Sequence, residues 1–276
     1  MTDAERGAAL EAIAAEIRVC SRCRLHENRA KAVPGEGNPD TEVVIVGEGP
    51  GRDENQAGRP FVGASGRLLT ELIESLGWRR DDVFITNVVK CWPPGNRDPA
   101  PDEIAACAPY LHRQLEALDP AVVVTAGKHS LGVFMPGERI SRVHGTARPA
   151  DPATGARDAL VLAMYHPAFA LYDGSNRSTL FTDIQALPTT LEAARARRTE
   201  GPPDAGPGSE PAAAVTGFEA PAPAEAPAMP GLLDAPAVLP DEPSAAPGPV
   251  DASQLIAAVA GGGSDADPDA DQLTLF

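Results

Sequence analysis

Short apolar runs recur along the first 198 residues, and amphipathic segments lie between them. Four runs have the length and the aliphatic content of buried strands, at 43–46, 83–86, 121–124 and 160–164. Helical periodicity marks five further segments, at 5–18, 63–76, 101–118, 128–134 and 178–197. Strands that alternate with helices are typical of a mostly parallel sheet covered on both faces. The pattern predicts an α/β fold, a three-layer α/β/α sandwich with a short, mostly parallel central sheet.

The composition changes after Arg198. No Lys or Arg follows this residue, whereas 13 of the 39 acidic residues do. The net charge of −16 therefore divides into −13 for residues 199–276 and −3 for residues 1–198. A segment rich in Pro, Ala, Gly and acidic residues cannot bury enough apolar surface to fold. We expect one folded domain, 1–198, followed by a disordered acidic tail, 199–276.

The chain holds four cysteines, Cys20, Cys23, Cys91 and Cys107. The first two form a C-x-x-C pair. No apolar signal segment precedes them, so we expect a cytoplasmic protein, in which disulfides are disfavoured. Four thiolates can hold one structural zinc ion or an iron–sulfur cluster, and the spacing alone does not separate the two. Scattered buried thiols beside a redox-active pair are the alternative.

A glycine-rich loop, Gly47-Glu48-Gly49-Pro50-Gly51, directly follows the first predicted strand. Glycines let a backbone approach a ligand closely, and open α/β sheets bind ligands at the carboxyl ends of their strands. By itself the loop is compatible with phosphate binding or with a tight turn. It lacks both the Lys-Ser/Thr of a P-loop and the G-x-G-x-x-G spacing.

Three further residues belong near this loop. Phe61 lies between glycines in Gly58-Arg59-Pro60-Phe61-Val62-Gly63, as a core residue or as a stacking platform for a flat ligand such as a nucleobase. Asn87 follows the second predicted strand and His166 follows the last one. Because parallel strands end at one edge of a sheet, these side chains can line one cleft with Glu48. A turn-capping Asn and a core His are the alternatives.

The combination resembles the family 4 uracil-DNA glycosylases, the iron–sulfur-containing branch of the uracil-DNA glycosylase superfamily. The resemblance runs from about Cys20 to Leu187 and rests on the cysteine pattern, GEGPG, GRPFVG, TN-x-x-KC and the HP motif, in family order. It implies a monofunctional DNA-repair enzyme that flips uracil out of DNA and hydrolyses its N-glycosidic bond, leaving an abasic site.

The resemblance implies a role for each motif in gripping the base. Phe61 would stack on the flipped uracil. The Asn87 amide would pair with a uracil carbonyl and the ring N–H, a polarity that cytosine reverses. His166, as a neutral donor, would stabilise negative charge on the departing base, and backbone N–H groups around Gly49 would help to bind it.

The resemblance also implies a catalytic carboxylate and a cofactor. Glu48 or Glu54 would offset the cationic sugar and orient the attacking water. A [4Fe–4S] cluster, rather than zinc, would be ligated by Cys20, Cys23, Cys91 and Cys107.

Two departures from related enzymes bear on the interaction with DNA. Ala168 stands where relatives have a serine, and the position expected for a wedge residue falls near Ala170. Phe169 or Leu171 would then fill the gap left by the flipped base, or wedging is weak and single-stranded DNA is preferred. The loop at 95–98 lacks the Arg/His-rich insert of relatives that capture the abasic sugar covalently, so we expect turnover.

Contacts to DNA phosphates must come from local positive charge, since the folded domain is not basic overall. Seven basic residues are expected on loops or helix starts at the ligand edge: Arg59, Lys90, Arg97, Lys128, Arg139, Arg142 and Arg177.

The end of the chain, Gln272-Leu273-Thr274-Leu275-Phe276, is apolar after an acidic stretch. It resembles the Q-L-x-L-F peptide by which bacterial DNA-processing proteins dock on the replication sliding clamp, through Gln272, Leu273, Leu275 and Phe276. A chance apolar ending is the alternative. We expect a monomer that binds uracil-containing DNA and no membrane. The rival hypotheses are a non-catalytic iron–sulfur DNA-binding adaptor and a glycosylase of the same fold for another deaminated base.

Overall fold

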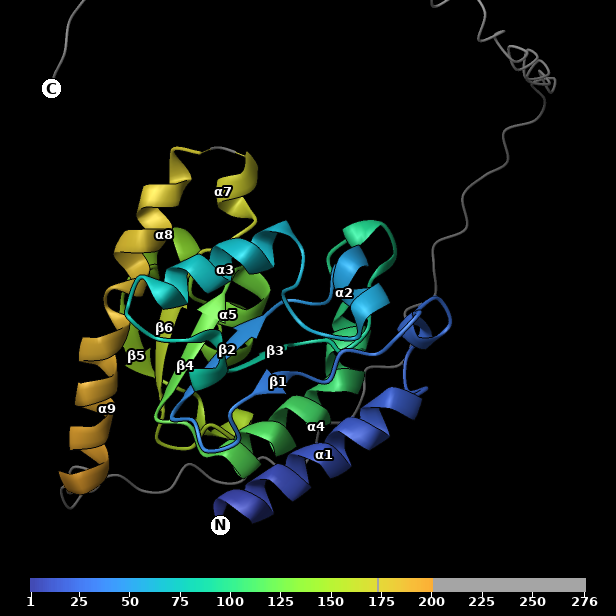
Figure 1. Ribbon diagram of the computed structural model, residues 1–276, viewed down its shortest axis with the longest axis horizontal. Coiled ribbons are helices and arrows are strands. Elements are labelled where there is room, and N and C mark those ends of the chain that lie inside the picture. Colours follow the sequence, from blue (N-terminus) through green and yellow to red (C-terminus); the bar gives the residue numbers. More distant parts are fainter. Residues whose placement is uncertain (173, 201–276) are drawn as a thin grey trace, which may run out of the picture. The chain divides into compact units, whose positions relative to one another are not determined.

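The computed structural model describes residues 1–172 and 174–200, and these residues form a central sheet flanked by helices (Figure 1). The strands are β1 (Glu36–Gly37), β2 (Val43–Gly47), β3 (Phe84–Asn87), β4 (Val122–Ala126), β5 (Ala147–Pro149) and β6 (Leu160–Met164). Their order across the sheet is β1-β3-β2-β4-β6-β5. The four central strands are parallel, and the short edge strands β1 and β5 pair antiparallel. The predicted, mostly parallel sheet is confirmed.

Helices cover both faces of the sheet. They are α1 (Asp3–Val19), α2 (Arg52–Ala57), α3 (Ala64–Glu74), α4 (Pro101–Leu118), α5 (Lys128–Phe134), α6 (Ile140–Val143), α7 (Phe169–Tyr172), α8 (Asn176–Ile184) and α9 (Leu187–Glu200). Apolar residues of α1, α4, α5 and α6 pack in one core, and those of α3, α8 and α9 pack in a second. Two cores separated by one sheet make the predicted three-layer α/β/α sandwich.

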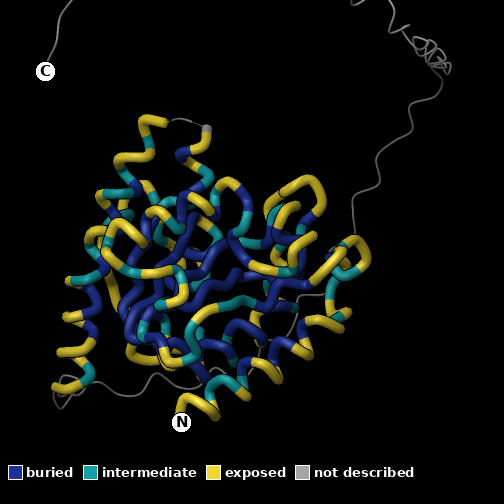
Figure 2. The backbone as a smooth tube through the Cα atoms, in the orientation of Figure 1, coloured by how far each residue is buried: buried dark blue, intermediate teal, exposed yellow. Residues whose placement is uncertain are grey.

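Each central strand contributes to both cores because successive side chains point to opposite faces of a sheet. In β2, Val44 and Val46 belong to the core under α1 and α4, whereas Val43 and Ile45 belong to the core under α3. The strands are accordingly buried along their whole length, and the exposed residues lie on the outer helices and loops (Figure 2). Continuous apolar runs in the sequence are the expected signature of such doubly covered strands.

The predicted elements differ from the structure in one long helix and in several short elements that were not predicted. The four predicted strands and the helix at 101–118 are present to within one or two residues. The single helix expected at 178–197 is instead two helices, α8 and α9, which part at Gln185–Ala186, just before Pro188. Proline lacks a backbone N–H and is accepted in the first turn of a helix but not in its interior, so it begins α9 rather than continuing α8. The edge strands and α2 are too short to carry a periodic signal.

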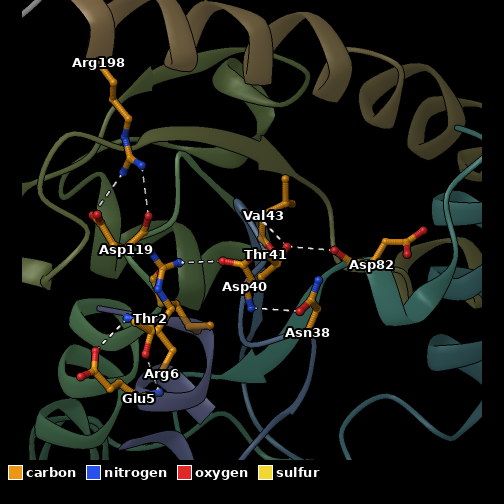
Figure 3. Close-up of polar contacts among 11 residues, drawn as sticks. Thr2, Glu5, Arg6, Asn38, Asp40, Thr41, Val43, Asp82, Asp119 and Arg198 are labelled. Atoms are coloured by element: carbon orange, nitrogen blue, oxygen red, sulfur yellow. Dashed lines mark hydrogen bonds and ion pairs between the residues drawn. The ribbon is translucent and has the colours of Figure 1, made fainter.

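Polar contacts fasten the end of the sheet where the parallel strands begin (Figure 3). Thr2 caps α1 in a reciprocal pair with Glu5, and Arg6 donates to the carbonyl of Leu118 at the end of α4. Arg198 of α9 donates to the carbonyls of Asp119 and Pro120, just before β4. These hydrogen bonds hold the outer helices at the amino ends of the parallel strands. The carboxyl ends of the strands are left open.

Helix α9 extends to Glu200, two residues beyond the predicted domain end at 198. The remainder of the predicted tail, including the peptide 272–276, lies outside the described residues. None of the helices in the described part of the chain is long and apolar enough to cross a membrane.

Candidate active site

A cleft of about 620 Å³ opens at the carboxyl edge of the parallel strands. Strand register places Gly47 beside Asn87 and Ala126 beside Met164, so the loops that follow β2, β3, β4 and β6 meet there. The cleft is lined by the predicted residues Glu48, Gly49, Glu54, Phe61, Asn87 and His166, and also by Pro50, Gly51, Ser65, Pro93, Asn96, Arg97, Asp98, Lys128, Ala168 and Phe169. Residues that are 118 positions apart in the sequence, Glu48 and His166, are therefore brought to one site.

Gly47 lets the side chains of Asn87 and Phe61 pack closely against β2 at the wall of the cleft. A Cβ at this position would lie 2.4 Å from Oδ1 of Asn87 and 2.5 Å from Cζ of Phe61. Both distances are far below van der Waals contact, so no larger residue fits unless these side chains move. The last residue of β2 must be glycine because an amide and an aromatic ring both pack against its backbone.

Phe61 adopts a left-handed backbone conformation, with φ of +49°. Strained positions of this kind persist only when their surroundings hold them, and they cluster at functional sites. Here the backbone is enclosed by Gly66, where a Cβ would lie 1.9 Å from the Phe61 carbonyl oxygen. The Phe61 ring lies 5.6 Å from the ring of His166, with 26° between the planes. Phe61 thus presents its ring to the cleft beside a histidine, although most of its surface is buried in the core under α3.

Glu54 holds this loop in place. Its carboxylate accepts hydrogen bonds from the backbone N–H groups of Gly51 at 3.0 Å, Val62 at 2.8 Å and Gly63 at 2.9 Å. The residue is buried, and both carboxylate oxygens already have donors. These bonds join the two ends of the segment that carries Phe61. The geometry therefore fits Glu54 to a positioning role better than to the orientation of a water molecule.

Asn87 is 1% exposed, and its Oδ1 atom has no hydrogen-bond partner among the described residues. Buried polar atoms are nearly always paired, and leaving one unpaired costs on the order of 1–3 kcal/mol. An unpaired buried acceptor at the wall of a cleft indicates that a ligand donor completes it.

His166 is held as a neutral hydrogen-bond donor. Burial lowers its pKa to about 4, although the nearby Glu54 carboxylate raises it in part. The backbone N–H of Ala168 donates to Nδ1 at 3.1 Å, so the proton of the neutral ring resides on Nε2. Gly127 permits this placement, since a Cβ there would lie 3.1 Å from Cβ of His166 and its φ of +99° favours glycine.

Glu48 lies in a cluster of charged and titratable groups, of which Asp98 and His129 were not predicted as site residues. Nε2 of His129 is 3.7 Å from a Glu48 carboxylate oxygen and 3.1 Å from one of Asp98, and Lys128 is 2.6 Å from Asp98. Burial raises the pKa of the Glu48 carboxyl, and Asp98 raises it further, while His129 and Lys128 oppose the rise. Glu48, Asp98 and His129 offer ligand atoms within 4.8 Å of one another. Lys128 already supplies a cation to this group.

The sequence carries one signal for His129, whose neighbour Lys128 was already expected at this edge as a DNA contact. Lys128 and His129 immediately follow Gly127 after β4, the remaining parallel strand whose carboxyl end reaches the cleft. Asp98 had no such signal, because its loop is irregular and only the folded chain brings it near β4.

The four cysteines line one small pocket between α1, α4 and the segment after β3. All four are free thiols, with Cys91 and Cys107 buried and the other two partly exposed. Three N–H donors point at sulfur atoms: Arg29 at Cys91 (3.3 Å), the backbone of Lys90 at Cys107 (3.3 Å) and the backbone of Arg22 at Cys20 (3.5 Å). Burial raises the pKa of Cys107 to about 11. Buried thiols in this state need a cation to become thiolates, and a metal group would supply it.

The seven basic residues expected to contact DNA fall into three groups. Lys90 is fully buried, so the prediction that it contacts phosphate is wrong; burial lowers its pKa to about 7. Arg59, Arg97, Lys128 and Arg177 each pair with a carboxylate, respectively of Glu36, Glu103, Asp98 and Glu71. Arg139 and Arg142 are exposed and have no carboxylate partner in the described part of the chain.

Of the two candidate wedge residues, Phe169 lines the cleft and Leu171 does not. Both side chains are exposed, Phe169 at 40% and Leu171 at 50%, whereas Ala170 is buried. The Phe169 ring stacks on Tyr165 with centroids 4.6 Å apart. An exposed ring that is supported from behind at the rim of the cleft fits insertion between bases better than Leu171 does.

Sequence comparisons agree with this geometry. The sequence model of the uracil DNA glycosylase superfamily matches residues 34–186. A type-4 uracil-DNA glycosylase from Sulfurisphaera tokodaii is 47% identical over 184 residues, which are 64% of this chain and 83% of the relative. One from Thermotoga maritima is 44% identical over 178 residues, 64% of this chain and 91% of the relative. A type-5 uracil-DNA glycosylase from Thermus thermophilus is 36% identical over 121 residues, 38% and 55% of the two chains. The chain therefore belongs to the uracil DNA glycosylase superfamily and, within it, to the type-4 family.

Proposed function

We propose that this protein is a uracil-DNA glycosylase of base-excision repair, which hydrolyses the bond between N1 of uracil and C1′ of its deoxyribose. The oxygen of a water molecule bonds to C1′, and the electron pair of the broken bond leaves with the base. The products are free uracil and an abasic site. The observation that carries the proposal is the buried, unpaired Oδ1 of Asn87 in a cleft beside an aromatic ring, in a chain of this family.

Base selection follows from complementarity to Asn87. Its Oδ1 accepts from the uracil N3–H, and its side-chain NH₂ donates to the O4 carbonyl. Cytosine presents an acceptor and a donor in the reverse order, so binding it would leave buried polar groups unpaired on both sides. A site built to pair polar groups rejects a mispaired analogue by several orders of magnitude. Phe61 supplies the apolar face on which the flipped base stacks.

Bond cleavage is assisted mainly by stabilisation of the leaving group. Negative charge develops on the uracil ring as the bond breaks, and the Nε2–H of neutral His166 donates to its O2 carbonyl. With a pKa of about 4, the His166 ring is uncharged at physiological pH and keeps the Nε2 proton that it donates. Backbone N–H groups around Gly49 add further donors near the base.

Glu48, rather than Glu54, is the carboxylate that orients the attacking water and balances the cationic sugar. Among the residues that the structure describes, no backbone N–H donates to the Glu48 carboxylate at the cleft wall, whereas three donate to Glu54. Its raised pKa makes Glu48 a better acceptor for a proton of the water than an exposed carboxylate. Nε2 of His129 lies near both carboxylates, 3.7 Å from Glu48 and 3.1 Å from Asp98, and counteracts the effect of Asp98 on the pKa of Glu48.

Cys20, Cys23, Cys91 and Cys107 are proposed to ligate a [4Fe–4S] cluster, whose chemistry here is structural. The four side chains surround one small pocket, and the preference for a cluster over zinc rests on the resemblance to the family 4 enzymes. N–H donors to sulfur, as from Arg29 and the Lys90 backbone, are typical of iron–sulfur sites. Metal and sulfide analysis of the purified protein distinguishes iron from zinc.

The partner of the C-terminal peptide is proposed to be the bacterial sliding clamp, on the resemblance of residues 272–276 alone. Deletion of Gln272–Phe276 should abolish binding to the clamp and leave excision from short oligonucleotides unchanged. Clamp binding that persists after the deletion refutes this assignment.

The activity is tested with labelled oligonucleotides that carry one uracil, either single-stranded or opposite guanine. The wild type should release uracil and leave an alkali-labile site. Asn87→Asp should lose this activity or redirect it toward cytosine, whereas the control Asn38→Asp, at the opposite edge of the sheet, should retain it. Tight DNA binding without cleavage by the wild type would refute the enzyme assignment and favour the adaptor.

A further inference from the structure

A buried lysine lies directly behind the proposed base-reading residue. Lys90 is 1% exposed, and its ammonium group donates three hydrogen bonds, to Oγ1 of Thr86 at 2.7 Å, the backbone oxygen of Asn87 at 2.8 Å and Oε1 of Gln114 at 2.7 Å. These bonds use all three ammonium donors, and none of the acceptors is a carboxylate. Burial of a lysine side chain costs desolvation free energy, and a buried lysine contributes nothing to solubility or surface charge. Its hydrogen bonds inside the protein are therefore the contribution to consider.

The contact with Asn87 fixes the peptide unit that carries the base reader. The carbonyl of this unit accepts from Lys90, and its N–H, which belongs to Val88, donates to the carbonyl of Gly47 at 2.9 Å. The side-chain Oδ1 of Asn87 has no partner of its own. The direction of the Asn87 amide therefore depends on the orientation of its backbone, which Lys90 and Gly47 hold from two sides.

The same lysine reaches the four-cysteine site. Its backbone N–H donates to the sulfur of Cys107 at 3.3 Å, and the residue lines the pocket that the cysteines surround. The next residue in the chain is Cys91. One residue thus contacts the proposed metal site through its backbone and the base-reading segment through its ammonium group.

We propose that Lys90 is a positioning residue that orients Asn87 for base recognition and couples it mechanically to the four-cysteine site. The inference rests on the proposed function, because Asn87 must read a base for its orientation to matter. It assigns to the cysteine site a part in base recognition that does not require electron transfer.

The alternative is that Lys90 only stabilises the buried polar network. Thr86 provides a matched control, since it is equally buried and its hydroxyl accepts from Lys90 and donates to the Pro34 carbonyl. Thr86→Val removes this hydroxyl but leaves the bond between Lys90 and Asn87. If the role of Lys90 is only structural, both Lys90→Met and Thr86→Val should lower the melting temperature and leave the inhibition constant of free uracil unchanged.

The experiment compares both variants with the full-length, metal-loaded wild type well below their melting temperatures. We expect Lys90→Met to raise the inhibition constant of free uracil by about tenfold and to lower kcat by up to about 100-fold, since a misplacement near 1 Å has effects of this size. KM for DNA and iron content should be unchanged, because neither phosphate contacts nor cysteines are altered. Thr86→Val should keep the wild-type inhibition constant. An unchanged constant in Lys90→Met overturns the positioning role.

Lys90→Met leaves Oε1 of Gln114 with only the long contact from the Thr86 hydroxyl, at 3.4 Å, and is at risk of misfolding. The double variant Lys90→Met/Gln114→Leu removes that acceptor, while Thr86 continues to donate to Pro34. The double variant should show the same loss of uracil affinity. If neither variant yields folded, iron-containing protein, the role of Lys90 is structural and the proposal is wrong.

The coupling is tested by the rate at which a chelator removes iron. Saturating uracil should slow the loss of iron severalfold in the wild type and not in Lys90→Met. Uracil bound to Asn87 restricts the motion of this residue, and Lys90, which is hydrogen-bonded to both Asn87 and Cys107, restricts the cysteine site in turn. An equal effect of uracil on both proteins overturns the coupling. Failure of the proposed function is recognised separately, since the wild type itself would then neither excise nor bind uracil.

Discussion

Replacement of Gly47 by alanine tests the steric basis of the base pocket. The added methyl group would lie 2.4 Å from Oδ1 of Asn87 and 2.5 Å from Cζ of Phe61, about 1 Å closer than ordinary contact allows. The φ angle of Gly47 is not positive, so alanine introduces no backbone strain and the effect is one of space alone. Both residues proposed to grip the base must move together.

The expected sizes follow from these distances. Displacement of a binding group by about 1 Å lowers catalysis by about 100-fold, which corresponds to about 2.7 kcal/mol of transition-state stabilisation. Overpacking of a core site costs about 1–3 kcal/mol of folding free energy, or about 2–12 °C in melting temperature for a domain of this size. We therefore expect Gly47→Ala to fold, with a moderately lower melting temperature and a much lower kcat/KM.

The assay is single-turnover excision of uracil from a single-stranded oligonucleotide, alongside thermal unfolding. Gly132→Ala is the control, because a Cβ at this position in α5 meets nothing within 4 Å. Alanine in a helix is more favourable than glycine, so this variant should be as stable as the wild type or more so, with unchanged activity. Wild-type kcat/KM in Gly47→Ala would refute the assignment of Asn87 and Phe61 to base binding.

Three further predictions follow from the site. Glu48→Gln should lower kcat by about 10²–10⁴-fold with little change in stability. Glu54→Gln should lower the free energy of unfolding by about 1–3 kcal/mol, because the NH₂ of the new amide would face backbone N–H donors. Activity and unfolding assays on both variants test this, and a large loss of kcat in Glu54→Gln with only a loss of stability in Glu48→Gln would reverse the two roles. Burial sets the pKa of His166 near 4, below its value of 6.5 when unfolded, so its stabilising contribution is complete above pH 6.5 and is lost as the pH falls to 4. The stability difference between wild type and His166→Gln should shift by at most about 3 kcal/mol over this range, and a difference independent of pH would contradict the burial of a neutral ring. In Arg139→Ser/Arg142→Ser, the slope of the logarithm of the DNA-binding constant against the logarithm of the salt concentration should become shallower by about one to two, the equivalent of one to two lost phosphate contacts. An unchanged slope would exclude both residues from the interface.

Much of the fold could be predicted from local patterns. Continuous apolar runs indicated strands buried on both faces, and the spacing of turns and amphipathic helices indicated the layered parallel sheet. The same logic placed Glu48, Asn87 and His166 at one edge, since parallel strands end together. Motif resemblance then supplied expected roles, and the structure brings those residues into one cleft.

Other features depended on contacts between distant segments, which local patterns do not encode. Lys90 was expected at the surface because lysine usually is, yet acceptors from α4 and β3 enclose its ammonium group. Asp98 and His129 lie beside Glu48 because the irregular loop that carries Asp98 packs against the start of α5, a contact that no local pattern predicts. The sequence separated Glu48 only slightly from Glu54 as the catalytic carboxylate, and the three backbone donors to Glu54 are visible only in the folded structure. The sequence by itself determined which elements form and which residues reach the edge of the sheet, because periodicity and strand direction are local properties. Only the tertiary structure decided the partners of each polar group, and those partners set its charge, its orientation and its role.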